Sequence, residues 1–241
     1  MLYKTRGIVL HQIKYSDSGI VVYLYTREFG RQTILIKGIR NKKSGKHIAL
    51  FQPLLILDIE LYYKERRAMQ TIKEFSAAYV PYDIQSDIKK NSVAIFLGEF
   101  LYSVLREETP NSELFDFIEA SIEYFDKEKT GFANFHIAFL AGMSGFLGFE
   151  PTPCPDEAYK YFDLRNGIFV LMPPVHGEYA GGEISGYLAA FFTTSFEKTG
   201  QISLKGSMRN EILETLLRYY AIHLPGLRKF KSLEILKEVF R

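Results

Sequence analysis

The sequence predicts a mixed α+β protein in which a small β-barrel precedes a bundle of α-helices. Short β-branched and aromatic runs fill the first eighty residues, and a helical period replaces them afterwards. The charge changes at the same place: residues 1–80 hold 14 Lys and Arg against 6 Asp and Glu, whereas residues 81–241 hold 16 against 22. Two changes at one position indicate two modules, 1–80 and 81–241, the first of which faces a polyanion.

The barrel is predicted from the number and spacing of the strand-like runs. Turn-like or polar segments separate five such runs within about eighty residues. The OB-fold, a five-stranded Greek-key barrel that binds single-stranded nucleic acid, fits this count. The predicted strands are residues 7–13, 19–26, 31–38, 53–63 and 69–80.

The helical module is predicted from apolar stripes at helical spacing. In the first helix, Val93, Leu97, Leu101 and Val104 share one face. Asn111 or Ser112 is expected to cap the second helix. The predicted helices are residues 86–108, 112–128, 131–149, 184–198, 207–224 and 232–240.

A segment rich in Pro and Gly, residues 150–182, interrupts the helices and predicts an irregular insert with a small hairpin. Cys154 and His176 raise the question of a metal site. A structural zinc site needs four ligands, usually with paired cysteines. One Cys and one His do not supply them, so neither a metal nor another cofactor is expected.

Catalytic motifs are missing from the sequence. Gly45-Lys46 resembles the end of a phosphate-binding loop, but Arg40 occupies the position of its first glycine and His47 that of its hydroxyl residue. Ser144 lacks the G-x-S-x-G spacing of a nucleophile elbow. The five histidines are scattered. We therefore expect a protein that is not an enzyme.

The cellular setting is predicted from two features. A single cysteine excludes an internal disulfide and fits a reducing cytoplasm. The chain contains no apolar run of membrane-spanning length and no signal-peptide pattern. We expect a cytoplasmic protein with no membrane partner.

The opening TRGIVLHQIKYSDSGIVVYLYTREFGRQTILIKGIR, residues 5–40, resembles the start of RecO, a family of bacterial recombination mediators. It carries the family's T-R-G-I-V-L strand, K-Y-x-[DE]-x strand start, T-x-x-x-G turn and K-G-x-R basic loop. FQPLLILDIELYYK, residues 51–64, is similar to a later strand of the family, and residues 218–240 are similar to its C-terminal helices. The resemblance therefore covers both ends of the chain.

This resemblance implies an N-terminal OB-fold, a helical domain and an inserted four-cysteine zinc finger. Only Cys154 remains of those ligands here, which implies a degenerate, metal-free insert at 150–182. The implied activity is binding of single- and double-stranded DNA without sequence specificity, and annealing of complementary strands, in the nucleoid. The implied partners are RecR and the acidic C-terminal tail of single-stranded-DNA-binding protein, so that RecA is loaded on coated strands in a RecF-type repair pathway.

DNA contacts are predicted for the cations of the first module, because Lys and Arg neutralise phosphates without reading sequence. Tyr15, Tyr23, Tyr25 and Phe29 are candidates for base stacking. Tyr23 and Tyr25 share one face of a strand, and we expect both in the core. The predicted DNA-binding residues are Arg6, Lys14, Lys37, Arg40, Lys42, Lys43, Lys46, Lys64, Arg66 and Arg67.

The basic end of the helical module is a second candidate site. A hydrophobic, acidic peptide tail requires an apolar pocket edged by cations. The alternative is that these cations complement helix dipoles. For the whole protein, two other functions remain open, a protein-interaction adaptor and an RNA-binding OB protein. The predicted tail-binding cations are Arg218, Arg228, Lys229 and Lys231, with Lys237 beyond them.

Overall fold

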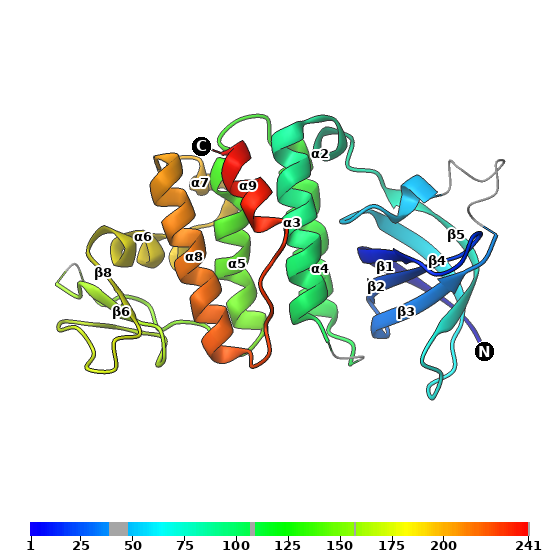
Figure 1. Ribbon diagram of the computed structural model, residues 1–241, viewed down its shortest axis with the longest axis horizontal. Helices are drawn as coiled ribbons and strands as arrows, with labels where there is room; N and C mark the ends of the chain where they lie inside the picture. Colours follow the sequence, from blue (N-terminus) through cyan, green and yellow to red (C-terminus); the bar gives the residue numbers. More distant parts are fainter. Residues whose placement is uncertain (39–47, 107–108, 157, 241) are drawn as a thin grey trace. The chain divides into compact units, whose positions relative to one another are not determined.

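The computed structural model describes residues 1–38, 48–106, 109–156 and 158–240, and it confirms the α+β class (Figure 1). Contacts divide the chain into two compact units. Unit 1 is Met1–Lys127 with Phe230–Leu236, and unit 2 is Glu128–Lys229 with Lys237–Arg241. The expected domains, 1–80 and 81–241, follow the change from strands to helices rather than these units, and they stay a prediction.

Five strands form a closed barrel in the order β1-β2-β3-β5-β4 (Figure 1). All neighbouring strands are antiparallel except β3 and β5, which are parallel. This arrangement confirms the predicted OB-fold. The strands are β1 (Leu2–Lys14), β2 (Ile20–Thr26), β3 (Gly30–Ile36), β4 (Ile56–Tyr62) and β5 (Gln70–Tyr79).

Strand β1 is longer than predicted because it closes the barrel. Its first half pairs with β4 and its second half with β2, and the register with β2 shifts between Val9 and His11. Such an irregularity bends a strand, which lets one strand belong to both sides of a barrel. Val22, Leu24 and Ile34 point inward and are fully buried in the barrel core.

Unit 1 also contains the helices α2 (Tyr82–Ser86), α3 (Ile88–Val104) and α4 (Ser112–Lys127), and the short 3-10 helix η1 (Ala49–Phe51). The side chain of Asp87 caps α3 by accepting hydrogen bonds from the backbone N–H groups of Lys89 and Lys90, at 2.7 and 3.0 Å. The side chain of Asn111 accepts from the Leu114 N–H at 3.0 Å, which confirms it as the predicted cap of α4.

Unit 2 is built around three longer helices, and one predicted boundary there is wrong. The predicted helix 184–198 is two helices, because Thr194 has an extended backbone (φ −94°, ψ 135°). Neighbouring β-branched threonines fit such a break. The helices are α5 (Phe135–Phe146), α6 (Gly182–Thr193), α7 (Phe196–Thr199) and α8 (Gly206–His223), with η2 (Phe132–Asn134) before α5; α9 (Leu233–Val239) begins in unit 1 and ends in unit 2.

The insert contains a three-stranded sheet in the order β7-β6-β8. The predicted hairpin is formed by β6 (Tyr161–Asp163) and β7 (Ile168–Val170), and β8 (Tyr179–Gly181) adds a third strand. Strand β8 was not predicted, because its three residues carry too little periodicity and no turn signal joins it to the predicted hairpin.

Candidate nucleic-acid interface

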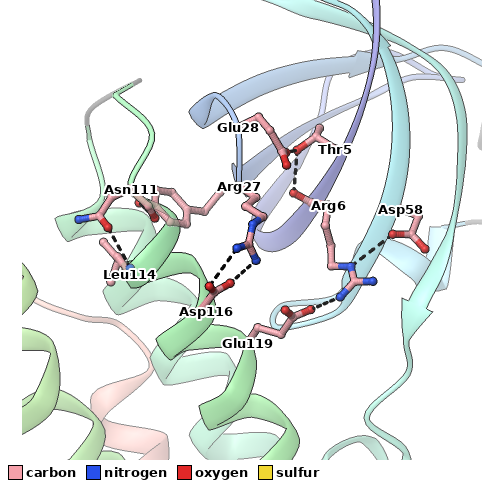
Figure 2. A network of polar contacts seen from close by, with 10 residues as sticks. Thr5, Arg6, Arg27, Glu28, Asp58, Asn111, Leu114, Asp116 and Glu119 are labelled. Carbon is pink, nitrogen blue, oxygen red and sulfur yellow. Dashed lines mark hydrogen bonds and ion pairs between the residues drawn. The ribbon is translucent and has the colours of Figure 1, made fainter.

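Arg6, the first predicted DNA contact, is already paired with carboxylates (Figure 2). Its Nε lies 3.3 Å from Oδ1 of Asp58 on β4, and its Nη1 lies 2.8 Å from Oε1 of Glu119 on α4. The hydrogen bond to Glu119 is the main cause of the raised pKa of Arg6. Two carboxylates neutralise this guanidinium, so a phosphate would have to displace them.

The neighbouring side chains extend this ionic network (Figure 2). Arg27, between β2 and β3, forms a two-pronged ion pair with Asp116 of α4, one arm of which is 3.0 Å long. The hydroxyl of Thr5 donates to Glu28. These cations therefore tie the barrel to α4 within unit 1.

The rest of the outer face of β1, β4 and β5 is also self-neutralised. Glu60 accepts ion pairs from Lys4 at 3.2 Å and from Lys73 at 3.0 Å, and the hydrogen bond to Lys73 is the main cause of its lowered pKa. A hollow of about 530 Å³ on this face is lined in part by Asp58, Glu60 and Glu74. Lys4 also lines the hollow but is paired with Glu60, so the acids there outnumber the cations and disfavour a phosphate backbone.

The outer face of β2 and β3 is covered by helices of unit 1. Tyr23 and Tyr25 share one face, as predicted, but that face points away from the barrel core and packs under α3 and α4. Tyr25 is 3% exposed and its ring stacks on Phe115 at 6.4 Å, and burial raises its pKa to about 12. Tyr23 contacts Tyr102 at 4.8 Å. Tyr25 has no room to stack on a base.

Arg31 is a structural cation that the sequence analysis did not single out. Its Nη1 donates to the backbone carbonyls of Tyr102 and Leu105, both at 2.9 Å, at the end of α3. Its guanidinium also lies over the Tyr102 ring, 4.4 Å from the centroid. Arg31 thus satisfies a helix C-terminus. Only its outward register on β3 distinguishes it in the sequence.

Four of the predicted DNA-binding cations are exposed, and their side chains form no ion pair or hydrogen bond with the described residues: Lys37, Lys64, Arg66 and Arg67. Lys14 is almost as open, with Asp17 at 3.8 Å. Exposed, unpaired ammonium and guanidinium groups neutralise phosphates at the lowest cost, because no internal partner must be released.

The turn that carries three of these cations is held in shape by one buried side chain. The amide nitrogen of Gln70 donates to the carbonyls of Lys64 and Arg67, at 2.9 and 3.0 Å. Its amide oxygen accepts from the Lys64 N–H at 3.0 Å. The backbone of the turn is therefore fixed while its side chains point into solvent.

The open cations border the seam between β3 and β5, where only two residue pairs form. Ile34 pairs with Gln70, and the two strands run in the same direction. The turn that precedes Gln70 therefore lies before this pair, and Lys37 lies after it. Lys37 lies three residues after Ile34, beyond the last β3–β5 pair, Leu35 with Thr71. The open cations therefore lie beyond both ends of the short β3–β5 pairing.

The predicted contacts Arg40, Lys42, Lys43 and Lys46 lie outside the described residues. They belong to the segment that continues from Lys37. Lys14 lies at the same end of the barrel, because it pairs with Ile20, which pairs in turn with Ile36. Of the predicted set, the structure therefore brings Lys14 and Lys37 together at one end of the seam.

The predicted tail-binding cations do not share one unit. Arg218 donates to the Tyr179 carbonyl at 2.8 Å, whereas Arg228 and Lys229 are exposed in unit 2. Lys231 belongs to unit 1, where its backbone N–H donates to Glu99 at 2.9 Å. The neighbouring Phe230 is 8% exposed and packs between aromatic rings of α3, so it forms no open pocket wall. Lys237 pairs with Glu214.

His176 and Cys154, the candidate metal ligands of segment 150–182, are engaged in local hydrogen bonds. Nε2 of His176 lies 3.2 Å from Asp163, and Cys154 Sγ lies 3.3 Å from the Asp156 carbonyl. Within the described residues, no group of three His, Cys, Asp or Glu side chains is arranged to hold a metal ion. Among the same residues, no helix is long and apolar enough to cross a bilayer.

Comparison with known proteins gives the family. Residues 1–80 match the family model described as "Recombination protein O N terminal", and residues 85–153 match "Recombination protein O C terminal". The chain is 38% identical over 240 residues to "DNA repair protein RecO" of Phocaeicola vulgatus, 37% over 242 residues to that of Bacteroides fragilis and 33% over 242 residues to that of Flavobacterium psychrophilum. Each match covers all of both chains, and this chain belongs to the RecO family.

Proposed function

We propose that this protein is a non-catalytic DNA-binding mediator of recombinational DNA repair. It binds single- and double-stranded DNA through the backbone, anneals complementary strands and, with RecR, helps to load RecA on strands coated by single-stranded-DNA-binding protein. Family membership supports the role. The observation that supports this binding site is the set of exposed, unpaired cations along the β3–β5 seam. The outer face of β2 and β3 is covered by helices, and the cations on the outer face of β1, β4 and β5 are paired with acids.

The mechanism requires only charge neutralisation. Lys37 and Lys14 at one end of the seam, and Lys64, Arg66 and Arg67 at the other, replace counterions along one strand. Each contact is exposed, so the grip is strong at low salt and weak at high salt. A strand held in this way keeps its bases free to pair with a second strand.

A salt series of fluorescence anisotropy with labelled single-stranded DNA tests the site. Lys37→Glu with Arg67→Glu should weaken binding and reduce the slope of log K against log salt by about 0.7 for each phosphate that is no longer neutralised. The matched control is Lys4→Glu with Lys73→Glu, which changes the net charge equally on the self-neutralised face. We expect the control to retain the native slope.

Three results would contradict parts of this proposal. Equal losses of affinity in both pairs would mean a diffuse charge effect rather than a seam. An RNA oligomer that binds more tightly than DNA of the same sequence would favour an RNA-binding protein, because 2′-hydroxyl contacts can discriminate the two. No binding to either would favour an adaptor that recognises proteins.

For the acidic tail of single-stranded-DNA-binding protein, we propose Arg228 and Lys229 as the cations that bind it. Both side chains are exposed, and neither forms an ion pair with the described residues. Reversal of both to Glu should abolish binding of a tail peptide, whereas Lys198→Glu with Lys205→Glu, also exposed in unit 2, should not. An unchanged affinity in the first variant would rule this site out.

A further inference from the structure

The barrel face on which OB-folds commonly bind bases is covered in this chain. Oligonucleotide-binding OB-folds use the face of their second and third strands. Here that face packs against α3 and α4, where Tyr23 contacts Tyr102 and Tyr25 stacks on Phe115. The open cations can neutralise phosphates, but a cation at a phosphate does not hold a base. Unpaired bases would therefore have to stack on aromatic side chains elsewhere on the barrel.

Three aromatic rings meet at one end of the barrel, and these three residues form the end cluster. The rings of Phe29 and Tyr63 stack on each other, with centroids 4.4 Å apart and planes inclined by 25°. The ring of Tyr3 meets both of them edge to face, at 5.3 Å from Phe29 and 6.1 Å from Tyr63. Phe29 and Tyr63 are partly buried against the barrel core. They therefore support the ring of Tyr3 and restrict its movement.

Tyr3 is the most open residue of the end cluster. It pairs with Leu61, which is fully buried in the barrel core, and directly paired residues of antiparallel strands project to the same side. A large ring on the inner side of a barrel is normally buried, yet Tyr3 is 38% exposed. Its hydroxyl donates to Sγ of Met1 at 3.3 Å, a weak acceptor. Part of an ordered aromatic ring is thus presented to solvent at the barrel end.

The end cluster adjoins the basic turn between β4 and β5. The turn begins directly after Tyr63, and hydrogen bonds to its backbone hold it in shape. Glu65 is its one acid, against three exposed cations: Lys64, Arg66 and Arg67. Positive charge beside an exposed aromatic ring is the combination by which proteins bind single-stranded nucleic acid. The charge of the turn therefore favours a polyanion that carries flat rings as the ligand of the end cluster.

We propose that Tyr3 binds an unpaired base of single-stranded DNA by stacking, while the turn 64–67 neutralises the adjoining phosphates. This inference rests on the proposed DNA-binding function and names the group that distinguishes single strands from duplexes. In a duplex the bases are stacked on one another and cannot reach the ring. A base that pairs with a complementary strand leaves Tyr3, so the annealed product is held less tightly than the single strand.

Fluorescence anisotropy with two labelled oligomers of equal length tests the stacking contact. One is an oligothymidylate, and the other carries the same phosphates but no bases. The native chain should bind the abasic oligomer at least about fivefold more weakly. Tyr3→Leu should weaken binding of the oligothymidylate by a similar factor and leave that of the abasic oligomer unchanged. The slope of log K against log salt should also persist, because no phosphate contact is lost.

Two further variants show whether the aromatic ring at this position is responsible. Tyr3→Phe keeps the ring and should bind the oligothymidylate as the native chain does. Tyr62→Leu removes a tyrosine of similar exposure, 46%, that shares the outer side of β4 with Asp58 and Glu60. It should leave the affinity for both oligomers unchanged. A loss in Tyr62→Leu equal to that in Tyr3→Leu would overturn the assignment to Tyr3.

A duplex of the same length separates a stacking role from a structural one. Tyr3→Leu and the native chain should bind it equally. A loss of duplex binding in Tyr3→Leu would mean that the substitution disturbs the turn, and it would overturn the stacking role. Salt-dependent binding of the native chain with equal affinity for both oligomers would overturn this inference and leave the proposed function intact. A native chain that binds no DNA would overturn both.

Discussion

Residues of the same type have different roles in this barrel, and the difference comes from partners that are distant in sequence. Arg6 and Lys37 are both cations of the basic N-terminal module, so the sequence makes both of them candidates for phosphate contacts. Arg6 is bonded to Glu119, 113 residues later, whereas Lys37 contacts no described acid. Arg31, which satisfies the end of α3, shows the same dependence. Sequence patterns predicted which residues are candidates, but tertiary contacts decide which of them remain open.

The most buried histidine predicts a pH effect on stability. Burial, with a smaller contribution from the charge of Arg209, lowers the pKa of His136 to about 3. In the unfolded chain this imidazole is protonated as the pH falls through about 6.5, whereas in the folded chain it stays neutral down to about pH 3. The free energy of unfolding should fall by about 1.4 kcal/mol for each pH unit below 6.5 from this group alone.

Urea unfolding between pH 7 and pH 4 measures this contribution. His136→Leu should remove that part of the pH dependence, although the carboxylates keep theirs. A variant whose stability depends on pH as steeply as that of the native protein would show that His136 does not titrate in this range.

At the scale of elements, periodicity predicted well whether a segment is a strand or a helix, but it did not predict which other elements pack against each face. Period two placed Tyr23 and Tyr25 on one face, but it has no information about which face a helix covers. The five strands and most helices were predictable because their apolar patterns are local. The break after Thr193 and strand β8 were not, because they depend on one backbone dihedral angle and on pairing between short segments.

Helix α3 packs so closely against the barrel at Gly98 that a larger residue there should be destabilising. A Cβ atom at Gly98 would lie 2.6 Å from Cβ of Pro53 and 3.1 Å from the Leu10 carbonyl. Gly98→Ala should therefore destabilise unit 1 by about 1–3 kcal/mol through overpacking, despite the better helix propensity of Ala. Chemical denaturation measures it. Gly186→Ala in α6, where the added methyl group meets open space, should instead stabilise by roughly 0.5–1 kcal/mol.

At the scale of the whole molecule, the chain crosses between its units three times. After unit 2 it returns to unit 1 at Phe230, and within α9 it leaves again. Glu99 of α3 holds the returning segment by accepting from the N–H groups of Lys231 and Ser232, both at 2.9 Å. Burial acts to raise the pKa of Glu99, but the hydrogen bonds from Ser232 and Lys231 outweigh it, so the pKa is lowered. No local pattern in the sequence predicts this return.

Removal of the chain after Lys229 should therefore weaken both units. Unit 1 loses Phe230, whose ring lies 5.8 Å from that of Phe96, and unit 2 loses Phe240, whose ring lies 5.8 Å from that of His136. Loss of a buried Phe side chain alone costs about 3–5 kcal/mol. Native-state hydrogen exchange should show reduced protection of the amides of α3 and of α5.

Phe230→Ala is the control that separates the two effects. It removes a side chain that packs in unit 1 only, so we expect protection to fall in α3 and to persist in α5. If the substitution lowered protection equally in both helices, the two units would unfold as one cooperative body, and the returning segment would join them energetically rather than contribute to each separately. If protection fell in α3 alone, each unit would unfold independently, and α9 would connect the two units through the chain without coupling their stabilities.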